Sequence, residues 1–289
     1  MNVELRHLRA FLAVADELHF GRAADALRIA QPALSQQIQR LEAELGTTLF
    51  TRTSRSVALT AAGTVLQARA RALVRQSDRD LDEVARVGRG ELGRLDVGFV
   101  SSALPLGPIE RVQRFRAAWP GVEIVVHEGY TSALLGRLAR GELDVATVRD
   151  PDPHEGVITE PFVSEPFAAV LPAGDRRASR SSIAGAELAD DPFVFFPRSA
   201  GERAHDLNLS PVTDAGGRVR ITQEASSWPT IIHFVGAGLG VTIAPRSATL
   251  SPPVSVVVLP LEGTTARSSL HLATRVGDDR AVVRNFRSV

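Results

Sequence analysis

A run of uncharged polar side chains near the N-terminus has the chemistry needed to read DNA bases. Pro32, Ser35, Gln36 and Gln39 share one face of a predicted helix if successive residues turn by about 100°. Amide and hydroxyl groups can hydrogen-bond to base edges in a major groove, where glutamine is suited to adenine. The alternative is that these are solvated positions of an ordinary amphipathic helix.

Two arginines follow this helix in a segment that reads as a β-hairpin. Arg52 and Arg55 lie at the polar tip between two short extended apolar pieces, as expected for a wing beside a DNA-reading helix. Their guanidinium groups can contact phosphates or enter a minor groove. The alternative for either residue alone is an ordinary surface arginine.

A second group of polar residues follows the ends of predicted strands. Ser101 and Ser102 come directly after the strand Leu95–Val100, Thr131 begins the helix after the next strand, and Arg149 ends the third strand. Ligands of open parallel sheets bind beyond the carboxyl ends of strands, where helix N-termini offer free N–H groups. A small anion would receive hydroxyl, N–H and guanidinium donors there.

Arg198 and Ser199 follow a later strand and would close on the same ligand from the opposite side. For each hydroxyl residue, the alternative is a plain cap or turn residue. For the two arginines the alternative is a salt bridge, formed by Arg149 with Asp144 or Asp150 and by Arg198 with Glu202.

The polar face near the N-terminus needs a small helical domain behind it. Helical spacing of apolar residues predicts a first helix from Leu5 to about Leu18 and then a short helix with small alanines, as a right-angled helix pair requires. The third helix begins near Pro32 and ends at Gly46. Its apolar stripe consists of Leu34, Ile38, Leu41 and Leu45. The short helix and tight turn before it favour base reading over a merely solvated face.

A long helix is predicted next, capped by Thr60 and running from Ala61 to about Val87. A seam with spacings of three and four residues is typical of a coiled coil. Its members are Leu66, Ala70, Leu73, Ser77, Leu81 and Val84. We expect this helix to dimerise the protein; the alternative is that it packs on its own C-terminal domain.

The remainder alternates strand and helix patterns, which indicates an α/β domain with largely parallel strands. Further predicted strands are Val122–His127, Leu143–Val148, Pro166–Leu171, Phe193–Phe196, Val219–Thr222 and Val241–Ile243. The predicted helices are Pro108–Ala118, Thr131–Arg140 and Trp228–Gly236.

Composition excludes several kinds of chemistry. The 289 residues contain 33 basic and 33 acidic side chains, and every basic residue is an arginine. Without cysteine or lysine there is no thiolate nucleophile, disulfide, Walker-A loop or Schiff-base lysine. The seven histidines never pair at metal-ligand spacing, so we expect no metal, cofactor or catalytic residue. Without an apolar run of about 18 residues or an export signal, we expect a cytoplasmic protein outside the membrane.

The N-terminal segment closely resembles the winged helix-turn-helix of LysR-type transcriptional regulators. The stretch that carries the resemblance is AADALRIAQPALSQQIQRLEAELGTTLFTRTSRSVALTAAG. The resemblance implies that Gln31, Pro32, Ser35 and Gln36 read bases and that Arg55 makes the wing contact. It places the inducer contacts at Ser102, Thr131 and Arg149, the last in members that sense aromatic-derived acids.

The same resemblance implies a fold, a set of domains and partners. The C-terminal part is similar to two-lobed periplasmic-binding-protein folds, so the fold class is α/β with an N-terminal all-α winged helix-turn-helix and a long linker helix. The expected domains are residues 1–60 for DNA binding, 61–90 for the linker helix, and 91–289 for the effector domain, with lobe I at about 91–164 and 266–289 and lobe II at about 165–265. Such regulators bind double-stranded DNA and a small organic or aromatic acid, contact RNA polymerase, and are commonly tetramers built from dimers.

Two other functions compete with regulation. A solute-binding protein of a transport system would share the two lobes, but would need an export signal and would not need residues 1–90. An enzyme would need a nucleophile, a metal site or a matched acid and base, and no such set is recognisable.

Overall fold

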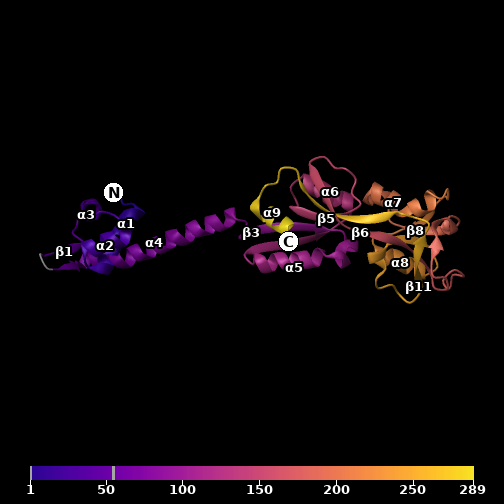
Figure 1. Cartoon of the computed structure of the whole chain (residues 1–289), viewed down its shortest axis with the longest axis horizontal. Coiled ribbons are helices and arrows are strands. Elements are labelled where there is room, and N and C mark those ends of the chain that lie inside the picture. Colours follow the sequence, from indigo (N-terminus) through magenta and orange to yellow (C-terminus); the bar gives the residue numbers. More distant parts are fainter. Residues whose placement is uncertain (1, 54–55) are drawn as a thin grey trace. The chain divides into compact units, whose positions relative to one another are not determined.

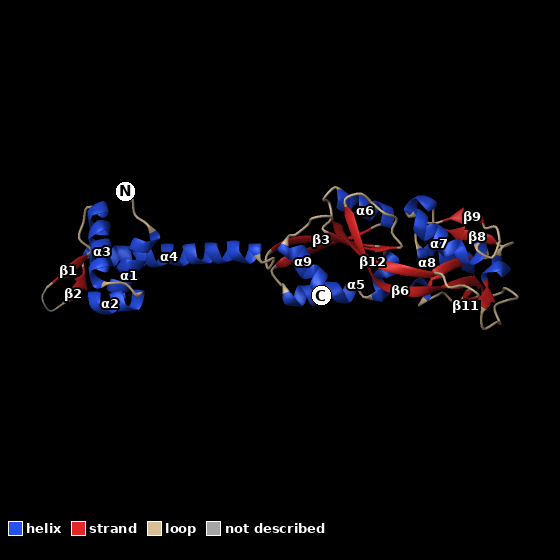
Figure 2. Ribbon diagram, turned by 45° about the horizontal axis from the view of Figure 1, so that its top comes forward, coloured by secondary structure: helices blue, strands red, loops and turns tan. Residues whose placement is uncertain are grey.

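The computed structural model describes residues 2–53 and 56–289, so Arg55, the predicted wing contact, lies outside the described residues. The chain divides into two compact units, residues 1–86 and 87–289. Helices dominate the first unit, whereas strands and helices alternate in the second (Figures 1 and 2). No helix of the described residues is long and apolar enough to cross a membrane.

Three helices form the core of the N-terminal unit. They are α1 (Leu5–Glu17), α2 (Phe20–Leu27) and α3 (Gln31–Leu45). Leu34, Ile38 and Leu41 of α3 are completely buried against Phe11 and its neighbours, which confirms the predicted apolar stripe. Gly46 ends α3 with a φ of 64°, a left-handed conformation that glycine adopts without strain.

A two-stranded wing follows α3. Its strands are β1 (Phe50–Arg52) and β2 (Val57–Leu59), paired antiparallel with Phe50 opposite Leu59. Glu42 of α3 anchors the first strand, because its Oε1 accepts the backbone N–H of Leu49 at 2.7 Å. The first strand of the wing is therefore held against α3, which keeps the hairpin beside the helix that is predicted to read bases.

The long helix α4 (Ala61–Gly88) begins as predicted, with Thr60 Oγ1 accepting the backbone N–H of Gly63 at 2.9 Å. The predicted seam does not stay on one surface. Ala70 is completely buried in the N-terminal core, whereas Leu81 and Val84 are 62% and 70% exposed. Only the later part of the seam is thus free to meet another chain, because the earlier part packs on the unit's own helices.

One mixed sheet runs through the second unit. Its eight strands follow the order β4-β3-β5-β12-β6-β11-β7, with β10 also paired to β6. The strands β3, β4 and β5 are parallel to one another, whereas β12 is antiparallel to both β5 and β6. The prediction of largely parallel strands therefore holds for the first part of this unit, and the strands that join its two parts are antiparallel.

The first part of the sheet and its helices form a compact body that we call lobe I. Its elements are β3 (Gly93–Phe99), η1 (Ser101–Leu106), α5 (Pro108–Ala118), β4 (Val122–Glu128), α6 (Thr131–Ala139), β5 (Val145–Arg149) and α9 (Ala281–Ser288). Helix α9 contributes Val283 and Phe286 to the core beneath Phe115. The C-terminal segment of the chain therefore completes lobe I.

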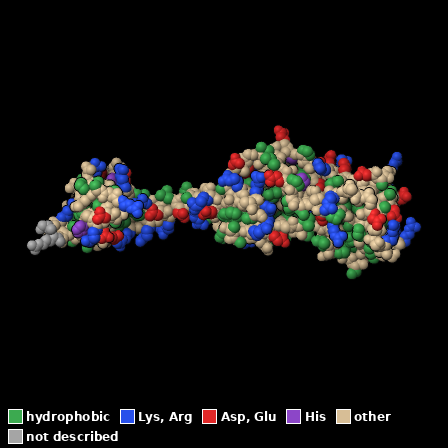
Figure 3. Space-filling view, in the orientation of Figure 1, with side chains coloured by type: hydrophobic (Ala, Val, Ile, Leu, Met, Phe, Trp, Pro, Cys, Tyr) green, Lys and Arg blue, Asp and Glu red, His purple; other side chains and the backbone are tan. Residues whose placement is uncertain are grey.

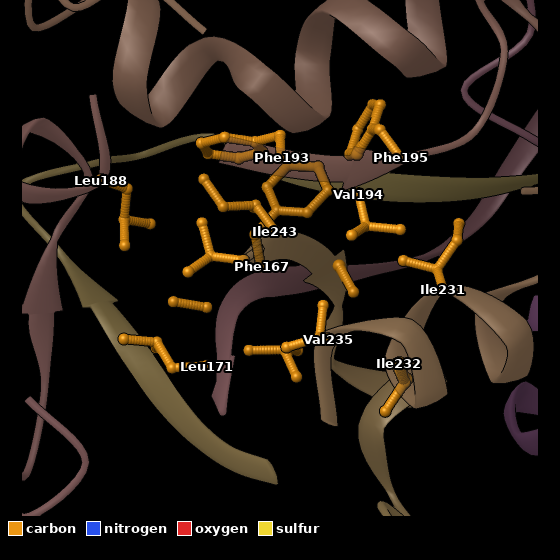
Figure 4. Packing of buried hydrophobic residues seen from close by; sticks show 14 of the residues in the cluster. Phe167, Leu171, Leu188, Phe193, Val194, Phe195, Ile231, Ile232, Val235 and Ile243 are labelled. Atoms are coloured by element: carbon orange, nitrogen blue, oxygen red, sulfur yellow. The ribbon is translucent and has the colours of Figure 1, made fainter. Parts of the chain in front are cut away.

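The second body, lobe II, is inserted between β5 and β12. Its elements are β7 (Ile183–Ala184), η2 (Gly185–Leu188), β8 (Pro192–Phe195), η3 (Arg198–Ala200), α7 (Glu202–Thr213), β9 (Arg220–Glu224), α8 (Trp228–Gly236), β10 (Thr242–Pro245), η4 (Arg246–Thr249) and β11 (Val256–Glu262). Phe167, Phe193 and Ile243 pack with α8 at the centre of its core (Figure 4).

Two long strands link the lobes. The strand β6 (Val157–Pro172) pairs with β12 (Arg267–Arg275) over its first part and with β10 and β11 over its second part. Only the segment Pro166–Leu171 of β6 was predicted. The earlier part contains Pro161, which lies opposite His271 where the ladder with β12 is irregular, between Leu270 and His271. A missing N–H is tolerated at such a position.

Candidate functional site

The helix α3 presents its polar face to solvent. Gln31, Pro32 and Gln36 are exposed and Ser35 is half-buried, on the side opposite the buried leucines. None of these side chains hydrogen-bonds to another described residue. Their amides and hydroxyl are free to pair with an external partner, so the geometry is compatible with the base-reading role, which stays a prediction.

Arg52 lies at the base of the wing, where it contacts the helices. Its guanidinium carbon is 4.3 Å from the centre of the Phe20 ring, and NH2 is 3.8 Å from the Glu42 carboxylate. The cation–π and ionic contacts tie β1 to α2 and α3. Arg52 therefore supports the wing, and any contact to a phosphate would be in addition to that role.

Lobe I and lobe II both line a small, partly open pocket in the second unit. The cavity has a volume of about 70 Å³. Four predicted residues line it together, namely Ser101, Ser102, Thr131 and Arg149. The residues after β3, at the start of α6 and at the end of β5 thus meet, as the strand-end argument expected.

Residues at several helix beginnings line this pocket. Ser101 and Ser102 open η1, Thr131 opens α6, and Trp228 opens α8 behind its cap Ser227. In α6 the residue Leu134 is the first whose backbone N–H donates within the helix, to the carbonyl of Tyr130 at 2.9 Å. Earlier N–H groups lack intrahelical partners, and together with the helix dipole they favour an anion.

On the face of the effector unit visible in Figure 3, arginine and acidic side chains are interspersed, so that face has no field of one sign. Local dipoles inside the pocket can attract an anion without such a field.

The hydroxyl group of Thr131 is hydrogen-bonded within lobe I. Its Oγ1 donates to the carbonyl oxygen of Arg149 at 3.0 Å and accepts the backbone N–H of the same residue at 3.2 Å. The side chain is buried and its hydroxyl proton is used. Thr131 therefore joins α6 to β5, and what it offers a ligand is the start of its helix.

The guanidinium of Arg149 is wholly occupied by protein partners. NH1 donates to Glu165 and Ser268, each at 2.8 Å, and NH2 donates to the Ser102 carbonyl at 2.9 Å and to Ser247 Oγ at 3.2 Å. Nε donates to Ser102 Oγ at 3.0 Å. Because an arginine side chain has five N–H groups, none is left for a ligand. The prediction of Arg149 as a direct donor to the effector is not what the geometry supports.

The alternative predicted for Arg149, a salt bridge, is present, but its partner is neither Asp144 nor Asp150. The buried carboxylate that pairs with it is Glu165, in the middle of β6. Asp150 instead accepts from Ser268 Oγ and from the backbone N–H of Ser269, each at 2.6 Å, and burial raises its pKa. The Arg149 network connects η1, β6, β12 and η4, so it ties both lobes together beneath the pocket.

Arg198 and Ser199 do not line the pocket. The Arg198 guanidinium is 2.7 Å from the Asp206 carboxylate and 3.6 Å from that of Glu202, on an exposed surface. Ser199 contributes a backbone carbonyl, which accepts from Ser132 Oγ across the lobes at 2.9 Å. The salt bridge to Glu202 that was the alternative for Arg198 is present, and no contact places either residue at a ligand.

The opposite wall of the pocket comes from residues that sequence reasoning missed. Phe196, Asn208 and Trp228 line it from lobe II, and Tyr130 lines it from lobe I. Phe196 is the last residue of the predicted strand Phe193–Phe196, so the strand-end rule would have found it. Asn208 lies on α7, a helix that was not predicted.

Comparisons with known proteins agree with one another. Residues 5–64 match the family model described as "Bacterial regulatory helix-turn-helix protein, lysR family", and residues 88–289 match "LysR substrate binding domain". Among curated proteins, YnfL of Escherichia coli, described as an uncharacterized HTH-type transcriptional regulator, is 41% identical over 256 residues, covering 86% of this chain and 84% of that protein. The HTH-type transcriptional regulator AlsR of Bacillus subtilis is 38% identical over 248 residues, covering 85% and 82%.

Solved structures show the same arrangement of elements. CbnR, a LysR family transcriptional regulator, superposes with a TM-score of 0.80 at 23% identity and covers 99% of each chain. The oxidized form of OxyR from Corynebacterium glutamicum gives a TM-score of 0.68 at 26% identity, covering 100% of this chain and 94% of that chain.

Proposed function

The chain belongs to the LysR family of bacterial transcriptional regulators, and we propose that its helix α3 reads an operator while the pocket between its lobes binds a small organic anion. It is a DNA-binding regulator with an effector domain. Its relatives are regulators, which sets aside the enzyme and solute-binding alternatives. Because its target is DNA, we place it in the cytoplasm.

One observation carries the effector proposal: the starts of α6 and α8 line a single pocket together with Ser101 and Ser102. Ser102 adds a hydroxyl there. Its Oγ accepts from Arg149 Nε at 3.0 Å, which leaves the hydroxyl proton available to a carboxylate. Since Arg149 is neutralised by Glu165, the helix starts and Ser101 and Ser102 would supply the attraction for the anion.

A fluorescence titration with short-chain carboxylates tests this proposal. Trp228 lines the pocket, so its emission reports on occupancy. We expect wild-type protein to bind at least one such acid, and Ser102→Ala to weaken binding about tenfold, as loss of a hydrogen bond to a charged group would. Ser164→Ala, at an exposed position of β6, is the control. Binding that is unaffected by Ser102→Ala would place the anion elsewhere.

The exposed amides of α3 carry the DNA-binding part of the proposal. We expect Gln31→Ala combined with Ser35→Ala to lower the ratio of operator to random-DNA affinity by about one to two orders of magnitude, at one to three kcal/mol per lost base contact. Gln113→Ala, an exposed glutamine of the effector unit, is the control. An unchanged ratio in anisotropy titrations at fixed salt would remove α3 as the reading element.

A second copy of the chain is the partner that fits α4. The exposed apolar side chains Leu73, Leu81 and Val84 lie on the part of the helix that the N-terminal core leaves uncovered. A helix with such a row pairs readily with its equivalent in a two-fold dimer. Two reading helices would then face two half-sites, so a partly palindromic operator is expected.

A further inference from the structure

The pocket contains one buried side-chain amide that has no protein partner. Asn208, on α7, is 1% exposed and lines the cavity. Its Oδ1 makes no hydrogen bond, and its Nδ2 makes none with any described residue. A buried amide without a partner is costly, and native structures retain few of them.

The surroundings of Asn208 are mostly apolar. The lining residues of lobe II are Phe196, Ala200, Ala204, Trp228 and Ile231, together with Ser226 and Ser227 just before α8. The rings of Phe196 and Trp228 meet edge to face, with centroids 5.5 Å apart. A leucine has nearly the shape of asparagine and would suit these apolar neighbours better, so packing alone does not explain the amide.

Most of the anion-binding groups lie on the other side of the same cavity. Ser101, Ser102 and the start of α6 belong to lobe I, whereas Asn208 belongs to lobe II together with the start of α8. A ligand whose carboxylate lies against lobe I therefore needs a second hydrogen-bonding group that meets the Asn208 amide.

We infer that Asn208 binds a hydroxyl group of the effector, which is therefore a small hydroxy acid. This inference rests on the proposed anion pocket. A half-turn about Cβ–Cγ exchanges the amide oxygen and nitrogen, and a hydroxyl group meets either atom because it both donates and accepts. A second carboxylate could only accept, and it would bring a charge against the aromatic wall.

The size of the cavity restricts the acid further. At roughly 10–15 Å³ of such volume per water molecule, the 70 Å³ cavity holds about five to seven waters. That corresponds to an acid of roughly six non-hydrogen atoms, such as lactate.

Matched pairs of acids test the inference on the full chain. The probes are lactate against propionate and 3-hydroxybutyrate against butyrate, titrated into wild-type protein and Asn208→Leu by calorimetry. We expect wild type to bind the hydroxy member of at least one pair about tenfold more tightly, as one additional hydrogen bond allows. Asn208→Leu should reduce that preference to less than about twofold, and Ser102→Ala should weaken both members of the pair equally.

The outcomes separate the two proposals. If wild type binds both members of each pair with the same affinity, or Asn208→Leu keeps the preference, the hydroxyl contact is refuted and the anion pocket stands. If neither member binds in either pair, both proposals fail. Since the wild-type comparison needs no variant, a poorly folding Asn208→Leu would not remove the test; we expect instead that this variant raises the Tm of the unliganded protein, because it removes the unpartnered amide.

Discussion

Arg149→Met should strongly destabilise the effector unit. The Arg149 and Glu165 side chains are 5% and 9% exposed, and their charged atoms are 2.8 Å apart. Removing the arginine leaves the Glu165 carboxylate buried with only the Ser247 hydroxyl and backbone N–H as donors, at 2.7 and 2.6 Å. Breaking one side of a buried ion pair typically costs about 3–5 kcal/mol.

That cost is large enough to measure without ambiguity. A loss of about 4 kcal/mol lowers the folding equilibrium constant by roughly a thousandfold. With a urea dependence of about 2 kcal/mol per molar, the unfolding midpoint should fall by about 2 M. Trp119 and Trp228 are the only tryptophans of the chain, and both lie in the effector unit. Tryptophan fluorescence therefore follows the unfolding of this unit in the full-length protein.

A double variant distinguishes the ion pair from simple loss of packing. Arg149→Met combined with Glu165→Leu removes both buried charges and should recover most of the lost stability, because a well-packed apolar pair replaces a buried ion pair at little cost. A single variant that loses less than about 1 kcal/mol would contradict the reasoning. So would a double variant no more stable than the single one.

Leu81→Glu should dissociate the dimer without unfolding the monomer, because Leu81 is 62% exposed; sedimentation equilibrium would show a monomer, and an unchanged dimer would move the interface elsewhere. Gly63→Ala should destabilise the N-terminal unit by about 1–3 kcal/mol in urea unfolding followed by circular dichroism, since the added Cβ would lie 2.2 Å from the Leu49 carbonyl oxygen; wild-type stability would show that this contact can relax. Burial, aided by the charge of Arg203, lowers the pKa of His271 below 6.5. The neutral imidazole therefore contributes fully to the free energy of unfolding above pH 6.5, and this contribution is lost as the pH falls through the pKa of the folded state. His271→Gln should flatten the decline of Tm between about pH 7 and pH 5, and an unchanged slope would refute this assignment.

Local signals allowed some elements to be predicted to the residue. The helices α5 and α8 have the bounds that the sequence predicted, and each has a proline in its first turn. In contrast, α7 was missed because Pro211 lies inside it and polar Asn208 interrupts its apolar face. A prediction from sequence patterns treats such residues as helix breaks. Packing of α7 against the rest of lobe II overrides their low helix propensity.

The site was predictable where it depended on strand ends and not where it depended on distant partners. Ser101 and Ser102 reach the pocket because the residues after a strand are placed by the sheet. The partner of Arg149 was not predictable. Glu165 lies on β6 and Arg149 on β5, and these two strands are brought near each other only because β12 pairs with both. Asn208 was missed together with its helix.

The way β6 and β12 join the lobes has a consequence for synthesis on the ribosome. Lobe II has all of its strands once β11 ends at Glu262, whereas lobe I still lacks β12 and α9. Lobe II, which comes later in the chain, can therefore finish folding first. At that point lobe I still has an unpaired sheet edge at β5. Shortened chains that end before residue 267 should leave that edge exposed to aggregation.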